Sequence, residues 1–265
     1  MTARLVVFIH GAFMSAESWA PWMQRFEARG YKCLAPAWPF LDHSVGDLQR
    51  APDPRFGKLG IGEIVDNYAS IIRDLEQPPI LVGHSFGGLF VQMLLDRGIG
   101  AAGVAIDPAP PKGVLPGMNS IRAGLPVLLG WGSWQSVRRM SFKLFKWAWV
   151  HTLSEPEQRQ AYDEHVIPTS GRLFLQALLA PFNNETKVNF RNGLRAPLLI
   201  VAGELDRTVE AKMNLANFRK YARSTAVTDY REFAGRTHWI VGQPGWELVA
   251  DHAMDWLENQ VRPAT

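Results

Sequence analysis

The chain has 265 residues, of which 47% are hydrophobic and 20% are charged, and its formal net charge at pH 7 is +3. This composition, without repeats or low-complexity stretches, is typical of a globular protein and excludes disordered and solenoid architectures. The small net charge and the lack of a basic recognition motif argue against nucleic acid as a partner, and a single cysteine, Cys33, excludes an internal disulfide.

Short apolar strands and amphipathic helices alternate along the first hundred residues. Each strand is an apolar run of the kind that is buried on both faces of a parallel sheet. Strands are predicted over residues 4–9, 32–37, 80–84 and 101–106. Helices are predicted over residues 15–29, 61–75 and 86–95, and the proline- and glycine-rich residues 40–60 are predicted to form a loop.

The same alternation returns near the C-terminus. Strands are predicted over residues 197–203 and 227–233, and helices over residues 209–221 and 244–260. The pattern predicts an α/β fold with a mostly parallel sheet of about six strands flanked by helices. In such folds, ligands bind beyond the carboxyl ends of the strands.

Residues 109–190 interrupt this alternation. They show no obvious buried strand, contain helical stretches broken by prolines and glycines, and are far too many for a loop. We therefore expect an inserted helical cap over residues 109–190, between two parts of one core, residues 1–108 and 191–265.

Aromatic and basic residues alternate within part of this expected cap, between positions 131 and 149. The rings could form the core of the cap itself, or the apolar face of a surface helix that touches a membrane. We favour the first interpretation, because a cap must in any case present an apolar face to the core beneath it.

A glycine-flanked serine stands between the predicted strand 80–84 and the predicted helix 86–95, in the sequence Gly83-His84-Ser85-Phe86-Gly87. The glycines permit a turn so tight that a Cβ at either position would clash, and the serine is left exposed at the edge of the sheet. Ser85 is therefore a candidate nucleophile, which needs a base, an acid that orients the base, and donors for an oxyanion.

Several motifs now point to a known family. The elbow around Ser85, His10-Gly11 after the first strand, Gly203-Glu204-Leu205-Asp206 and Thr237-His238-Trp239 resemble the motifs of the α/β-hydrolase superfamily. The resemblance covers nearly all of the chain outside the cap. It implies the α/β-hydrolase fold and a serine-based catalytic triad, although this fold supports many reactions.

The family's order of serine, acid and histidine implies the roles of the other residues. His238, just after the last strand, is the expected base. Asp206, beyond strand 197–203, is the expected acid, and Asp107, at the end of the preceding strand, is its rival. The family's oxyanion hole implies two backbone donors, Phe86 and Ala12, with Phe13 as second choice for the latter.

These residues lead us to expect a carboxylesterase-like serine hydrolase that cleaves an ester, or a lactone or thioester, through an acyl-enzyme. The aromatic cap suggests a small apolar or aromatic substrate, in a pocket formed by Phe13, Trp131, Trp134 and Trp239. The same triad could instead serve a C–C bond hydrolase, a cofactor-free haloperoxidase or a hydroxynitrile lyase, or the pocket could belong to a non-catalytic ligand receptor.

The sequence also indicates that the protein lacks a metal site, a cofactor and a membrane-spanning segment. It has no paired cysteines and no His-x-x-x-His pattern, so we expect neither a metal nor a cofactor. No stretch reaches the roughly 18 apolar residues of a membrane span, and the N-terminal apolar run is too short for a secretory signal. We expect a cytoplasmic protein without stable membrane insertion, and the sequence leaves its oligomeric state open.

Overall fold

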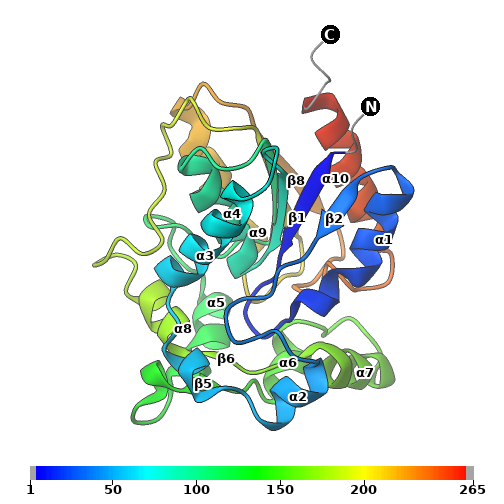
Figure 1. The fold of residues 1–265 in the computed structure, drawn as a ribbon. Helices are drawn as coiled ribbons and strands as arrows, with labels where there is room; N and C mark the ends of the chain where they lie inside the picture. The colour runs from blue at the N-terminus through cyan, green and yellow to red at the C-terminus, as the bar shows by residue number, and fades with distance from the viewer. Residues whose placement is uncertain (1–3, 261–265) are drawn as a thin grey trace.

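The structure, a computed structural model that describes residues 4–260, is built around one parallel sheet (Figure 1). Six strands follow one another across it in the order β2-β1-β3-β4-β7-β8. Their bounds are β1 Leu5–Ile9, β2 Lys32–Leu34, β3 Ile80–His84, β4 Ala102–Ile106, β7 Leu198–Gly203 and β8 Thr228–Phe233. Every neighbouring pair is parallel, which confirms the predicted α/β class.

The register of the sheet brings the loops that follow four strands to one edge. Ile9 pairs with Gly83, and His84 pairs with Ile106, so β1, β3 and β4 end at nearly the same level. Ile106 in turn pairs with Val201 of β7. The residues that follow these strands are therefore neighbours in space, although they are far apart in the sequence.

Helices cover both faces of the sheet (Figure 1). Their bounds are α1 Ala20–Ala28, α3 Ile61–Arg73, α4 Phe86–Asp96, α9 Ala211–Lys220 and α10 Glu247–Gln260. An ion pair of 2.7 Å between Arg25 and Asp251 joins α1 to α10 on one face. On the other face α3 lies beside α4, and Asn217 of α9 donates a hydrogen bond to Gln92 of α4.

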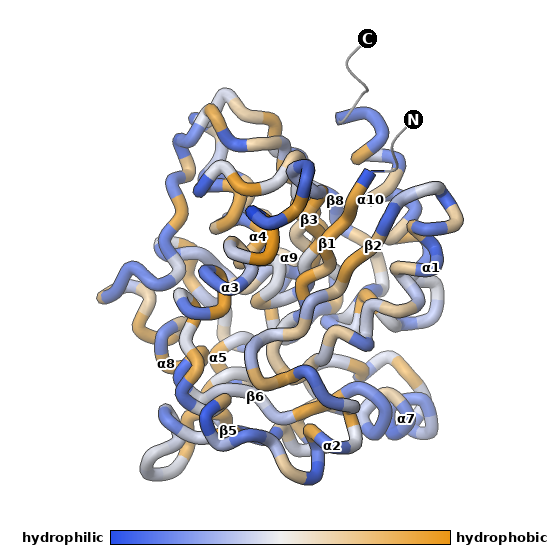
Figure 2. The backbone as a smooth tube through the Cα atoms, viewed as in Figure 1, coloured by the Kyte–Doolittle hydropathy of each residue, from blue (hydrophilic) through white to orange (hydrophobic). Residues whose placement is uncertain are grey.

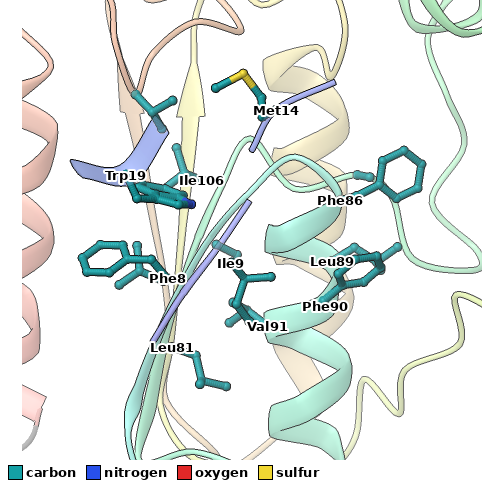
Figure 3. Packing of buried hydrophobic residues seen from close by; sticks show 14 of the residues in the cluster. Phe8, Ile9, Met14, Trp19, Leu81, Phe86, Leu89, Phe90, Val91 and Ile106 are labelled. Carbon is teal, nitrogen blue, oxygen red and sulfur yellow. The ribbon is translucent and has the colours of Figure 1, made fainter. Parts of the chain in front are cut away.

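The core lies between the sheet and these helices, where the most hydrophobic parts of the chain pack together (Figure 2). Phe8 of β1 packs against Trp19 and Phe26, with ring centroids 5.1 and 5.2 Å apart. On the other side Ile9 faces Val91 of α4 (Figure 3). Strands β3, β4 and β7 are buried along their whole length, as their continuous apolar sequence predicts.

Local capping signals add structure to residues 40–60, which we expected to be a loop. Helix α2, Val45–Arg50, begins at Ser44, whose hydroxyl accepts a hydrogen bond from the N–H of Asp47 at 3.2 Å. The 3-10 turn η2, Pro54–Lys58, begins in the same way at Asp53. Both are too short to show helical periodicity, so capping side chains were the only sequence signal for them.

Residues 107–197 are here called the β4–β7 segment. Its helices lie across the carboxyl end of the sheet, and the chain after the last of them returns beside the sheet to the start of β7 (Figure 1). Its helices are α5 Met118–Gly124, α6 Phe142–Ala148, α7 Glu155–His165 and α8 Gly171–Leu178, and its 3-10 turns are η3 Leu125–Leu128 and η4 Ser133–Gln135. Two short strands, β5 Val137–Arg138 and β6 Thr169–Ser170, pair in antiparallel fashion. None of the helices that the structure describes is long and apolar enough to cross a membrane.

Candidate active site

Ser85 occupies the sharp turn between β3 and α4, with a backbone conformation of φ 56° and ψ −120°. The two flanking glycines are there for steric reasons. A Cβ on Gly83 would lie 2.3 Å from the carbonyl oxygen of Gly87, and one on Gly87 would lie 2.0 Å from the carbonyl oxygen of Ile9. The strained turn is therefore possible only with glycine at both positions, and it holds the Ser85 side chain at the edge of the sheet.

His238 lies in the turn after β8, with its ring next to the serine. Its Nε2 is 3.1 Å from Oγ of Ser85, so the hydroxyl can donate its proton to the ring. The ring is fully buried and packs edge-on against Trp149, with ring centroids 4.7 Å apart. The imidazole is thus held in one orientation by its surroundings.

Asp206 lies on the opposite side of the imidazole. Nδ1 of His238 donates a hydrogen bond of 2.6 Å to Oδ2 of Asp206. The other oxygen, Oδ1, accepts hydrogen bonds from the backbone N–H groups of Thr208 and Val209. This carboxylate is fixed in place, it selects the tautomer in which Nε2 is free to accept a proton, and it can stabilise an imidazolium.

Asp107, the rival acid, is also fully buried but makes other contacts. Its Oδ1 accepts a hydrogen bond of 2.8 Å from the N–H of Gly203, and its Oδ2 has no hydrogen-bond partner among the described residues. Burial, and next the nearby charge of Asp206, raise the pKa of Asp107 well above its ordinary value. The structure therefore places Asp206 on Nδ1 of His238 and leaves Asp107 as a buried neighbour that makes no hydrogen bond to the imidazole.

The loop after β1 touches the serine directly. A Cβ on Gly11 would lie 2.8 Å from Cβ and 3.4 Å from Oγ of Ser85, so this backbone passes within contact of the side chain. Ala12 and Phe13 follow at once and line the same cavity as Ser85. The N–H of Phe86 is the first in α4. The first N–H groups of a helix have no hydrogen-bond acceptor in the backbone of that helix. The expected oxyanion donors thus lie on both sides of the serine.

A cavity of about 410 Å³ opens beside Ser85. Its wall is almost entirely apolar and comes mainly from the β4–β7 segment, with Val114, Leu125, Leu128, Phe174 and Ala177 among its residues. Among the described residues of the wall, Lys112 is the one ionisable side chain. The volume is within the range of about 300–1,000 Å³ that small-molecule sites occupy.

The structure brings only one of the four expected pocket residues, Phe13, to the wall of this cavity. Trp131 is 97% exposed and packs edge-on against Trp134 in the loop that follows η3. Trp239 is buried elsewhere, against Phe145 and His165. Proximity to a motif or to other aromatic residues did not predict which side chains line the cavity, because this depends on how α5 and α8 pack over the sheet.

Comparison with known proteins agrees with this architecture. A model of the alpha/beta hydrolase family matches residues 6–251. The chain belongs to the α/β-hydrolase family. Matches among solved structures show the same fold, whereas a search of curated proteins finds no match.

Three of the structures similar to this α/β-hydrolase illustrate the range. A monoacylglycerol lipase from Paleococcus ferrophilus is 21% identical with a TM-score of 0.70, and the alignment covers 97% of this chain and 95% of the lipase. A pyrethroid hydrolase from Sphingobium faniae is 15% identical with a TM-score of 0.69, covering 97% and 98% of the two chains. A methylesterase from Arabidopsis is 16% identical with a TM-score of 0.68, covering 97% and 99%.

In this α/β-hydrolase, two further side chains hold the turn that contains His238. We did not select either of them, His84 or Gln243, from the sequence. The ring of His84 makes a hydrogen bond of 2.9 Å with the carbonyl oxygen of His238, and burial lowers the pKa of His84 well below its usual value. Oε1 of Gln243 accepts hydrogen bonds from the N–H and the hydroxyl of Thr237. The place of His84 inside the elbow was a possible signal, but nothing in the sequence marks Gln243.

His84, Asp107 and His238 offer potential metal-binding atoms within 4.8 Å of one another. Both rings are already engaged, since His238 bonds Asp206 and Ser85, and His84 bonds the backbone. A metal ion would have to displace these hydrogen bonds, so this cluster fits a hydrogen-bonded hydrolytic site better than a metal centre.

Proposed function

We propose that this protein is a serine hydrolase that cleaves carboxylic esters, or related lactones or thioesters, with an apolar acyl or alcohol group. The observation that supports this most strongly is the continuous hydrogen-bonded chain from Ser85 through His238 to Asp206, which faces an apolar cavity. The three similar structures named above are a lipase, a pyrethroid hydrolase and a methylesterase, in keeping with chemistry at an ester bond.

In the proposed reaction, Oγ of Ser85 attacks the ester carbonyl carbon while Nε2 of His238 takes the hydroxyl proton. The resulting oxyanion accepts hydrogen bonds from the backbone N–H groups of Phe86 and Ala12, each worth about 3 kcal/mol in the transition state. The imidazolium, stabilised by Asp206, returns its proton to the departing alkoxide, and the acyl group stays on Ser85. A water molecule, deprotonated by His238, then releases the acid and restores the serine.

The β4–β7 segment is the proposed cap, over residues 109–190 of the chain. It supplies most of the cavity wall, so its apolar side chains would select the substrate. Because that wall has hardly any polar partners to offer, a charged or strongly hydrated group would lose its solvation there without replacement. An alkyl or aromatic group would gain about 25 cal/mol for each Å² that it buries.

Labelling with a fluorophosphonate probe tests the proposal. The probe phosphonylates an activated serine, so the wild-type protein should be labelled and Ser85→Ala should not. Ser120→Ala is the matched control, because Ser120 is another serine of the cavity wall and its loss should leave labelling intact. Equal labelling of wild type and Ser85→Ala, or no labelling of either, would contradict the proposal.

A further inference from the structure

Exposed apolar side chains gather around the opening of the cavity. Of the fourteen large hydrophobic side chains that are exposed in residues 4–260, nine lie between Leu115 and Phe182. The five most exposed of these, here called the apolar rim, are Leu115, Met118, Leu129, Trp131 and Phe182, with exposed fractions from 60% to 97%. Such a concentration is unusual on a soluble surface and marks an interaction site.

Three of the five residues of the apolar rim adjoin the cavity wall. Leu115 itself lines the wall, Leu129 follows the wall residue Leu128, and Phe182 follows the wall residue Pro181. The supporting elements pack on one another, since α8 contacts η3 and η4, and α5 continues into η3 (Figure 1). A partner that covers the rim would therefore also cover the entrance to the cavity beside Ser85.

Basic residues outnumber acidic ones in the part of the chain that carries four of the five rim side chains. Residues 108–154 contain six lysines and arginines and no aspartate or glutamate. Arg122 of α5 is exposed, and Arg138 donates hydrogen bonds to the carbonyl oxygens of Val127 and Leu129, directly beneath the rim. Glu210, the acid closest to α5, is paired with Lys212 at 3.0 Å.

We propose that the apolar rim docks onto a lipid surface that carries negative charge. Apolar side chains that enter the boundary between headgroups and acyl chains, surrounded by cations, are the combination that binds an anionic interface. The same positive charge disfavours a symmetric contact between two copies of this face. If the proposed function also holds, an amphiphilic ester would pass from the lipid phase directly into the cavity.

This surface shares only Trp131 with the aromatic stretch between positions 131 and 149. Phe145, Ala148 and Trp149 of that stretch are buried, so α6 cannot present them to a membrane. The exposed side chains come instead from the start of α5 and the residues just before it, the loop after η3 and the turn after α8. The helix in the sequence that most resembled a membrane-touching helix is therefore part of the core.

Flotation with vesicles of ether-linked phosphatidylcholine, with or without phosphatidylglycerol, tests the proposal without any hydrolysis of the lipid. The wild-type protein should float with the anionic vesicles, less with the neutral ones, and less as salt is added. Trp131→Gln combined with Phe182→Gln should weaken binding at least about tenfold, because both side chains lose their apolar contact with the lipid.

Leu194→Gln combined with Leu248→Gln is the matched control, because both leucines are exposed and neither belongs to the apolar rim: Leu194 lies just before β7, and Leu248 lies in α10. This control should bind as wild type does, and the rim variant should still hydrolyse a soluble short-chain ester. Failure to bind anionic vesicles, equal binding by the rim variant, or a role of the rim in self-association instead would overturn the proposal. Ser85→Ala should bind vesicles normally, so loss of activity and loss of docking are separate outcomes.

Discussion

Asp107 and Asp206 follow neighbouring strands, β4 and β7, and it is Asp206 whose carboxylate accepts the Nδ1 proton of His238, at 2.6 Å. Asp107 instead bonds the backbone N–H of Gly203. Both carboxyl groups are buried, and the ionisation of both at once is unfavourable because their negative charges repel each other. Burial, and next the charge of Asp206, raise the pKa of Asp107 and so favour its neutral form, while Asp206 faces the histidine.

The division of roles predicts unequal effects of two matched substitutions. Asp206→Asn should lower kcat for a p-nitrophenyl ester by roughly 10⁴-fold, because an amide in that place favours the wrong imidazole tautomer. Asp107→Asn should change kcat far less, since Asp107 makes no hydrogen bond to His238 and an amide oxygen can still accept the hydrogen bond from the N–H of Gly203. Steady-state kinetics of the two variants decide the matter, and the opposite ranking would make Asp107 the acid.

Acid should destabilise the protein through His10. Burial lowers the pKa of His10 from 6.5 to about 4, and its Nε2 accepts a hydrogen bond from the N–H of Trp38. Because the folded pKa is depressed, the unfolded state binds more protons between these values. The resulting stability is complete above pH 6.5 and is lost as the pH falls to about 4, a change of about 3 kcal/mol.

Urea unfolding across this pH range, with His10→Gln beside wild type, measures the effect. Glutamine can still accept the hydrogen bond from Trp38 but does not titrate, so the variant should lose much less stability on acidification. The exposed His43 serves as control, because His43→Gln should retain the wild-type slope. A slope that is the same in His10→Gln and wild type would mean that His10 is not the titrating group.

The cavity wall should set the chain length of the substrate. Ala123 of α5 lines the cavity and is 6% exposed, so Ala123→Leu would add three carbon atoms to the space that the substrate occupies. We expect kcat/KM for a long-chain p-nitrophenyl ester to fall by about tenfold or more, with little change for the acetate. Ala28→Leu on the exposed end of α1 should change neither. An equal loss for short and long esters would place the acyl chain elsewhere.

Much of this site was predictable because the α/β-hydrolase pattern is local in the sequence. The buried strands are recognisable in the sequence as continuous apolar runs. Glycine is required on both sides of Ser85, because a Cβ there would lie only 2.3 or 2.0 Å from a backbone oxygen. Because every strand runs in parallel, each motif at a strand end is bound to reach the same edge of the sheet. Ser85, His238 and Asp206 could therefore be named without knowing their distances.

The tertiary structure alone decided what depends on packing between distant segments. The family pattern favoured Asp206 over Asp107, but only side-chain geometry shows which of the two bonds Nδ1 of His238. The cavity wall and the exposure of Trp131 depend on how α5, η3 and α8 lie over the sheet, and helical periodicity does not encode this arrangement. The motifs of the sequence determined which residues carry the proposed chemistry, and the packing of the β4–β7 segment determined the cavity beside them.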